Sequence, residues 1–263
     1  MELLQFRLRW IHWENKMAVQ RINILGVPVD VCQKSELEEK ILELMDRERP
    51  SQIIFLSIWD LLKARGKNEY AECVRNADLI LPVSKSILRG ARFLKKTVPV
   101  RYNPFDATIS ILSFLENRYK SFYMFGGRKK ALVEAERNVK KTFKTLSVVG
   151  RYVGYYKAQA EEGIIEAIRK SSPSLVLLSE GVKNKELWPY YNRDKFNTSI
   201  FMYYRDAIGI FGRRIKRINP KTFERGHEIW GEVVRNPLKI FLLFPYSWYI
   251  ISLVWNRLFK KED

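Results

Sequence analysis

The regular pattern of apolar positions begins near Arg21 and predicts strands that alternate with helices. Short apolar runs bounded by glycine, proline or polar residues are typical of strands buried in a sheet. Such runs occupy 52–57, 79–81, 121–125, 175–178 and 198–203. This alternation predicts an α/β fold with a mostly parallel sheet flanked by crossover helices.

Helical spacing is clearest after the 121–125 run, where one apolar face is formed by Leu132, Ala135, Val139 and Phe143. Further helices are expected over 60–76, 86–95 and 160–170. Ahead of them, 22–31 is typical of a strand pair around Gly26 and Pro28. Ser35 and Glu38 have the spacing of a capping box, which predicts that a helix opens at Ser35.

In a parallel sheet, ligands bind beyond the carboxyl ends of the strands. Those ends are Ser57, Pro82, Gly126-Gly127 and 179–181. Gly126-Gly127 stands between a strand and a helix, where backbone N–H groups and the helix dipole favour a phosphate. The alternative is that the two glycines make a turn and nothing more.

The composition of the chain changes after Asp206. Residues 212–217 form a basic cluster in which Arg213, Arg214 and Arg217 are candidates to bind a diphosphate, because guanidinium groups match phosphate oxygens with paired donors. The alternatives are a solvated basic face and general attraction to lipid headgroups. We therefore divide the chain into an N-terminal extension (1–20), an α/β core (21–205) and a basic appendage (206–263).

The appendage contains an uncharged run, 240–255, rich in large apolar and aromatic residues. It is shorter than the ~20 residues that cross a bilayer as a helix, and Pro245 interrupts it. Trp248, Tyr249 and Trp255 suit a membrane interface, and the flanking cations suit anionic lipid. We expect a segment that lies on the membrane; the alternative is a buried terminal helix that completes the core or a dimer.

The net charge of the chain favours anionic partners. Lys and Arg number 47 against 29 Asp and Glu, a net charge of +18, which favours nucleic acid, anionic lipid or phosphorylated substrates unless it serves solubility alone. Nucleic acid is the weakest of these, because no helix-turn-helix, RNP-like strand or zinc finger is recognisable. With two separated cysteines, Cys32 and Cys73, and two histidines, we expect reduced thiols, no metal site and no cofactor.

The N-terminal residues 1–16 lack the features of a secretory signal. Two interpretations stay open for them: a short amphipathic helix that touches a membrane, and an upstream start with the native protein beginning at Met17.

Seven segments follow one another in an order that resembles the WecG/TagA/CpsF glycosyltransferases over about Ile22 to Lys239. The segments are INILGVPVD (22–30), NADLILP (76–82), RYNPFD (101–106), FYMFGG (122–127), VVGRYVGYY (148–156), GVKNKELW (181–188) and HEIWGEVVRNP (227–237). The set as a whole is more specific than any one of these segments.

The resemblance implies a Rossmann-like sheet with a basic appendage that approaches the inner face of the cell membrane. It implies transfer, with inversion, of an N-acetylmannosamine-type sugar from a UDP-sugar to a polyprenyl-diphosphate-linked acceptor in cell-envelope polysaccharide synthesis. An aspartate of an Asp-Gly motif would be the general base, and appendage arginines would neutralise diphosphate. The substrate-binding residues expected on this basis are Ser57, Arg101, Gly126, Gly127, Glu186, Arg213, Arg214 and Arg217.

The sequence departs from the family pattern at the positions that the resemblance assigns to catalysis and substrate binding. Val83-Ser84 stands where the Asp-Gly pair would be, and valine cannot accept a proton. Trp59 replaces an asparagine, Lys183-Asn184-Lys185 replaces Pro-Lys-Gln ahead of Glu186, and Pro104 replaces a glycine; Glu232 falls where the family has an arginine. Asp60 and Asp106 are weak candidates for a relocated base, and both are also candidates for helix N-caps.

Two functions remain. One is a divergent glycosyltransferase that works peripherally at the cytoplasmic face of the membrane. The other is a catalytically inactive relative that serves as a membrane-associated binding or scaffold protein, with a protein partner or as a homo-oligomer.

Overall fold

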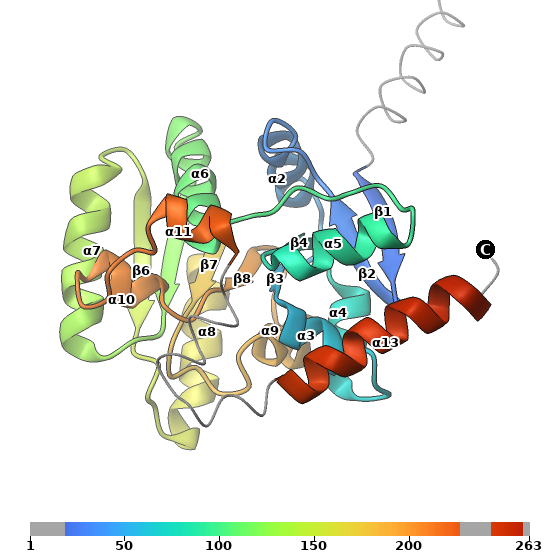
Figure 1. The fold of residues 1–263 in the computed structure, drawn as a ribbon. Helices are drawn as coiled ribbons and strands as arrows, with labels where there is room; N and C mark the ends of the chain where they lie inside the picture. The colour runs from blue at the N-terminus through green and yellow to red at the C-terminus, as the bar shows by residue number, and fades with distance from the viewer. Residues whose placement is uncertain (1–18, 227–242, 260–263) are drawn as a thin grey trace, which may run out of the picture.

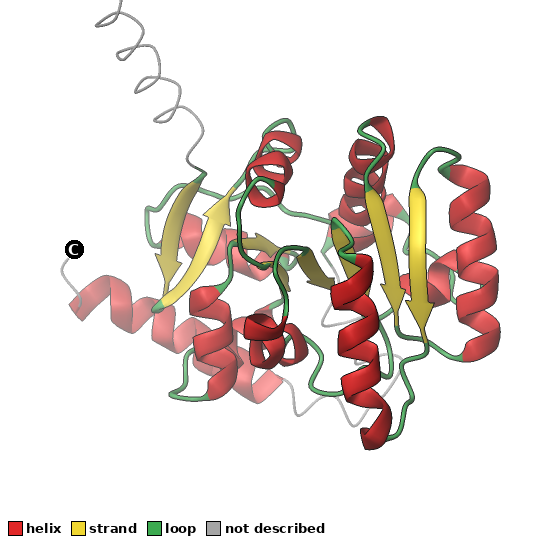
Figure 2. Cartoon of the chain, turned by 180° about the vertical axis from the view of Figure 1, so that it is seen from behind, coloured by secondary structure: helices red, strands yellow, loops and turns green. Residues whose placement is uncertain are grey.

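The computed structural model describes residues 19–226 and 243–259. A six-stranded sheet lies at the centre, with strand order β4-β3-β8-β7-β5-β6 and parallel pairing throughout (Figures 1 and 2). Its strands are β3 (Ser51–Leu56), β4 (Leu79–Pro82), β5 (Ser121–Phe125), β6 (Ser147–Tyr152), β7 (Leu175–Leu178) and β8 (Ile200–Tyr203). An antiparallel hairpin of β1 (Gln20–Ile24) and β2 (Val27–Val31) stands beside β4.

Helices connect the strands and cover both faces of the sheet. The α-helices are α2 (Leu37–Met45), α3 (Ile58–Ala64), α4 (Glu69–Asn76), α5 (Lys85–Phe93), α6 (Pro104–Asn117), α7 (Lys129–Thr142), α8 (Glu161–Ser171), α9 (Leu187–Asn192), α10 (Ala207–Phe211), α11 (Pro220–Arg225) and α13 (Leu243–Phe259). Two 3₁₀ turns, η1 (Ala158–Ala160) and η2 (Arg193–Lys195), precede α8 and follow α9.

The alternation of side chains along the strands separates the core into two sides. Ile53 and Phe55 of β3 pack with α2, α6, α7 and α10 on one face. Ile54 and Leu56 point the other way, towards α3, α4, α5 and α13. Tyr123 and Phe125 of β5 lie on that second face with α8 and α9. The predicted α/β architecture with a mostly parallel sheet is confirmed.

Local predictions differ from the structure in three places. The capping box at Ser35 was wrong: α2 begins at Leu37, and the side chain of Glu36 accepts a hydrogen bond from the backbone N–H of Gln33 instead. The predicted 60–76 helix is two helices, because Gly66 lies between α3 and α4 and Asn68 caps the second one. β6 pairs with β5 although its sequence lacks a fully apolar run.

Helix α13 packs against α5 through a buried tyrosine. The hydroxyl of Tyr249 donates to the backbone oxygen of Ser86 at 3.0 Å, and a Cβ on Gly90 would overlap that hydroxyl. Arg65 donates to the hydroxyl of Ser252 at 2.9 Å, and Leu253 is buried beside it. The side of α13 that carries these residues is therefore fixed to the core.

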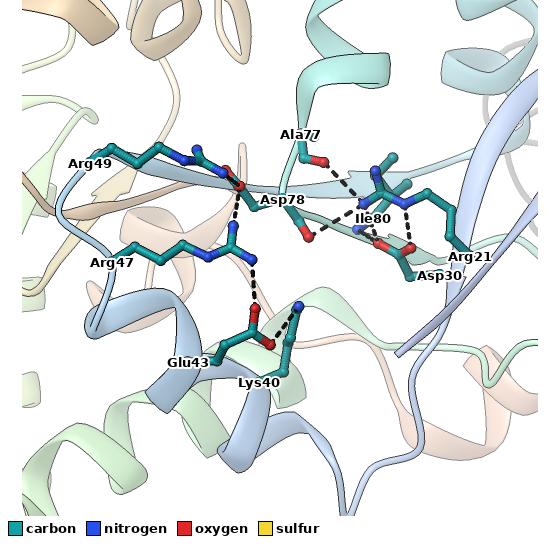
Figure 3. Close-up of polar contacts among 9 residues, drawn as sticks. All are labelled: Arg21, Asp30, Lys40, Glu43, Arg47, Arg49, Ala77, Asp78 and Ile80. Atoms are coloured by element: carbon teal, nitrogen blue, oxygen red, sulfur yellow. Dashed lines mark hydrogen bonds and ion pairs between the residues drawn. The ribbon is translucent and has the colours of Figure 1, made fainter. Parts of the chain in front are cut away.

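Two buried carboxylates join the hairpin and α2 to the sheet (Figure 3). Asp30 accepts from Arg21 at 2.7 and 2.9 Å and from the backbone N–H of Ile80 at 2.7 Å. Asp78 accepts from Arg47 and Arg49. The hydrogen bond to Asp30 raises the pKa of Arg21 against the opposing effect of burial. Each carboxylate thus has several donors that offset the loss of its hydration.

We expect Asp30→Ala to lower the free energy of unfolding by about 3 kcal/mol, because it leaves Arg21 without its carboxylate and a buried N–H without an acceptor. Urea titration followed by circular dichroism measures the change. The control is Glu166→Ala, which removes a solvent-exposed carboxylate paired with Arg169 and should leave the midpoint unchanged. Equal midpoints for both variants would contradict a stabilising role for Asp30.

Candidate active site

The loops that follow β5, β6 and β7 meet backbone against backbone at the carboxyl edge of the sheet. The N–H of Gly127 donates to the oxygen of Glu180 at 2.6 Å, and the N–H of Gly154 donates to the oxygen of Gly127 at 3.0 Å. Gly126 has φ +139°, and a Cβ there would lie 2.8 Å from the backbone nitrogen of Ser179. We call the residues Gly126, Gly127, Gly154 and Gly181 the glycine platform.

A basic cavity of about 650 Å³ adjoins the glycine platform, and we call it the α7 cavity. Its lining consists of Gly127, Arg128, Lys129, Lys130, Ala131, Glu180, Gly209, Arg214 and Ile215. Helix α7 begins here with Lys129 and Lys130, so its N-terminal dipole and the side-chain cations add to one another. The arrangement suits a phosphate or diphosphate group.

A second cavity, of about 350 Å³, lies between α5, α6 and α11 and is called the α11 cavity. Arg101 crosses it: its Nε donates to the oxygen of Val83 at 2.8 Å, and its guanidinium lies 3.7 Å from the ring centroid of Phe223. Burial lowers the pKa of Arg101 to about 10, so the guanidinium still carries its charge at neutral pH. Lys34 and Lys85 also line this cavity.

Asp106 lies in the α11 cavity, paired with Arg217 at 2.6 Å. It is the third residue of α6, whose N-cap is the side chain of Asn103 rather than Asp106 itself. Asp60 accepts from the backbone N–H and from the hydroxyl of Ser57, and together they form a capping box at the start of α3. Both base candidates are thus engaged in contacts that position helices or the appendage.

Val83 and Ser84 connect the end of β4 to the end of β3 and the start of α3 through hydrogen bonds. The N–H of Val83 donates to the oxygen of Leu56, at the end of β3. The hydroxyl of Ser84 is buried and accepts from the N–H of Ile58 at 3.0 Å. Val83 and Ser84 therefore hold the ends of β3 and β4 together.

Glu186 lies at the end of the loop between β7 and α9, where its backbone oxygen accepts from Nε2 of Gln52 at 2.7 Å. Its pKa is raised to about 7, first by burial and then by the charge of Asp60, against the opposing charges of Lys185 and Lys63. Tyr70 of α4 is buried, and its pKa is raised first by burial and then by the charges of Asp60 and Glu186. Nothing in the sequence marked Tyr70, because its place in α4 is that of an ordinary buried aromatic.

The predicted residues fall into three groups. Gly127 and Arg214 line the α7 cavity, which Gly126 adjoins; Arg101 and the Asp106–Arg217 pair meet at the α11 cavity; Ser57 and Glu186 belong to neither, Ser57 being bonded to Asp60 and the backbone of Glu186 to Gln52. Within the described residues, Arg213 lines neither cavity. The matched segment 227–237, with Glu232, lies outside the described residues, as do 1–18.

Across 19–226 and 243–259, no group of three or more His, Cys, Asp or Glu side chains is arranged to hold a metal ion. Over the same residues, every helix falls short of the length and apolarity needed to cross a membrane.

Comparison with known proteins agrees with the motif order. Residues 22–263 match the family described as "Glycosyl transferase WecG/TagA/CpsF family". The chain is also 26% identical over 193 residues to the N-acetylglucosaminyldiphosphoundecaprenol N-acetyl-beta-D-mannosaminyltransferase of Bacillus spizizenii, covering 73% of this chain and 74% of that relative. The resemblance predicted from the seven segments is confirmed, and the chain belongs to the WecG/TagA/CpsF family of glycosyl transferases.

Proposed function

We propose that this protein transfers an N-acetylmannosamine-type sugar from a UDP-sugar to a polyprenyl-diphosphate-linked sugar. The observation that carries the proposal is the glycine platform beside the cationic α7 cavity, at the edge of a parallel sheet where ligands bind. The name of the Bacillus spizizenii relative supports the choice of sugar and acceptor, because it describes an N-acetylmannosaminyl transfer to an N-acetylglucosaminyl diphosphoundecaprenol.

The α7 cavity suits the diphosphate of the donor. Lys129, Lys130 and Arg214 supply positive charge, and the platform brings backbone close to the ligand where a side chain would obstruct it. Negative charge grows on this diphosphate as the glycosidic bond breaks. Fixed cations at this position would therefore stabilise the transition state more than the ground state.

The α11 cavity suits the diphosphate of the lipid-linked acceptor. Lys34, Lys85 and Arg101 line it, and Arg217 can exchange Asp106 for a phosphate oxygen. Because the guanidinium of Arg217 is half-exposed, leaving Asp106 costs little.

Helix α13 suits a membrane surface. Tyr249 and Leu253 hold one side of it on the core, while Phe244, Trp248, Ile251, Trp255 and Phe259 are between 56% and 84% exposed on the outside. Their spacing of three or four residues forms a continuous apolar stripe. We propose that this stripe rests in the inner face of the cell membrane, near the lipid-linked acceptor, and that the protein is peripheral.

Calorimetric titration with UDP and UDP-N-acetylmannosamine tests the donor site. We expect micromolar binding, at least tenfold weaker in Lys129→Ala/Arg214→Ala because two cations facing the diphosphate are lost. Lys170→Ala, which removes an exposed lysine of α8, is the matched control and should bind as the wild type does. Folded protein that binds neither ligand would reject the donor site and favour the catalytically inactive scaffold.

Flotation with vesicles containing anionic lipid tests the membrane surface. The triple variant Trp248→Glu/Ile251→Glu/Trp255→Glu should lose at least nine-tenths of the bound fraction, because three charges replace the apolar stripe while Tyr249 and Leu253 stay in place. Tyr119→Glu changes a residue that is 78% exposed elsewhere on the surface and serves as the control. Unchanged flotation of the triple variant would show that α13 does not contact lipid.

A further inference from the structure

A groove lies at the amino edge of the central sheet, opposite the edge that carries the glycine platform. Ser51 opens β3 and Asp78 directly precedes β4, so both lie where these parallel strands begin. Two adjoining cavities, of about 400 and 200 Å³, share Arg49, Asn76 and Asp78 as lining residues. We call the two cavities together the amino-edge groove. Neither substrate of the proposed transfer is assigned to it.

The larger cavity of the groove carries a surplus of positive charge. Its charged lining residues are the cations Arg21, Lys40, Arg47, Arg49 and Arg75 and the carboxylates Asp30 and Asp78. Arg47 and Arg49 donate to the same oxygen of Asp78 (Figure 3). Because one carboxylate balances the charge of only one guanidinium group, unbalanced positive charge remains in the cavity.

Two further arginines of the groove have no buried carboxylate to balance. Arg75 of α4 makes no hydrogen bond or ion pair with another residue of the described chain. Arg193 lines the smaller cavity over the ring of Tyr190, and its ion pair with Asp194 is long, at 3.8 Å. Both arginines are exposed, so their guanidinium N–H groups are accessible to a ligand.

The smaller cavity also contains a hydroxyl group without a partner. Ser51 lines this cavity and is 2% exposed, and its Oγ has no hydrogen-bond partner among the described residues. Burial of an unpaired hydroxyl costs free energy, which a hydrogen bond to a ligand oxygen would recover. The backbone N–H of Ser51 already donates to the oxygen of Ser199, so the hydroxyl is the group left for a ligand.

From this arrangement we propose that the amino-edge groove binds an oligophosphate, an anion with two or more linked phosphate groups. Guanidinium groups match phosphate oxygens with paired donors. Arg49 belongs to both cavities, so linked phosphates can contact cations in each. A phosphate suits the groove better than a carboxylate because it offers more charge and more acceptor oxygens. The site is separate from the proposed transfer and does not depend on it.

Calorimetric titration of the full chain with sodium triphosphate tests the groove. Saturating UDP is present throughout to fill the α7 cavity, and Lys129→Ala/Arg214→Ala is titrated in parallel. We expect micromolar binding in both proteins, weakened by added salt. Arg75→Ala/Arg193→Ala should bind about tenfold more weakly, because two unbalanced cations are lost.

The matched control is Lys141→Ala/Lys144→Ala, which removes two exposed lysines at and just beyond the end of α7. It changes the net charge equally and should bind triphosphate as the wild type does. Triphosphate binding that is unchanged in Arg75→Ala/Arg193→Ala, or equally weakened in the control, would overturn the site.

Ser51→Ala separates a binding role from a structural one. It should weaken triphosphate binding about fivefold, the value of one hydrogen bond. Because the hydroxyl has no partner in the free protein, the same change should leave the melting temperature unchanged or raise it. A lower melting temperature with unchanged affinity would overturn the part assigned to Ser51.

Two more titrations identify the class of ligand. ATP that binds about tenfold more tightly than triphosphate, with the gain lost in Tyr190→Ala, would identify the phosphate chain of a nucleotide, because a base can stack on that ring. Equal affinity would identify a free oligophosphate. A hexaglutamate peptide that binds as tightly as triphosphate would overturn the choice of phosphate. All of these outcomes leave the transferase untouched, since its donor site is tested by UDP-sugar binding.

Discussion

The close approach of backbone at the glycine platform is the constraint on which the site depends. Parallel strands deliver all their carboxyl ends to one edge, so the connecting loops must share a small space. Gly126 and Gly154 allow that because the neighbouring strand-end loops occupy the space that a Cβ would need. The same packing fixes where the β7–α9 loop begins, because the oxygen of Glu180 accepts from the N–H of Gly127. It also places Ile208 of α10 against Gly127, which continues the chain towards Arg214.

Val83 and Ser84 have a structural role at the carboxyl edge of the sheet. Ser84 uses its hydroxyl to accept the N–H of Ile58, and Val83 donates its N–H to the end of β3. One side chain and one backbone group thereby join β3, β4 and α3 at the edge where the substrates are proposed to bind.

Much of the fold could be predicted from the local pattern of apolar and polar residues. The runs 121–125 and 175–178 became β5 and β7 because a short apolar segment between polar ends has few alternatives to a central strand. The pattern of apolar and polar residues failed to predict the elements that depend on contacts with distant parts of the chain. The helix expected to open at Ser35 begins at Leu37 after a turn in which Glu36 accepts from the N–H of Gln33, and β6 exists because β5 offers it hydrogen bonds. The contact between the backbone oxygen of Glu186 and Cys73 was beyond prediction, since it joins α4 to a distant loop that contains two left-handed residues.

The contact between Asp30 and Ile80 has a consequence for solubility. β4 is the outermost strand on its side of the sheet, and an outermost strand offers backbone N–H groups to any extended peptide that comes near. The carboxylate of Asp30 occupies one of those groups, and the β1–β2 hairpin that carries it stands alongside as a cover. A single side chain thereby removes a nucleation point for intermolecular β-pairing, so a neighbouring chain meets a carboxylate there instead of an unpaired strand.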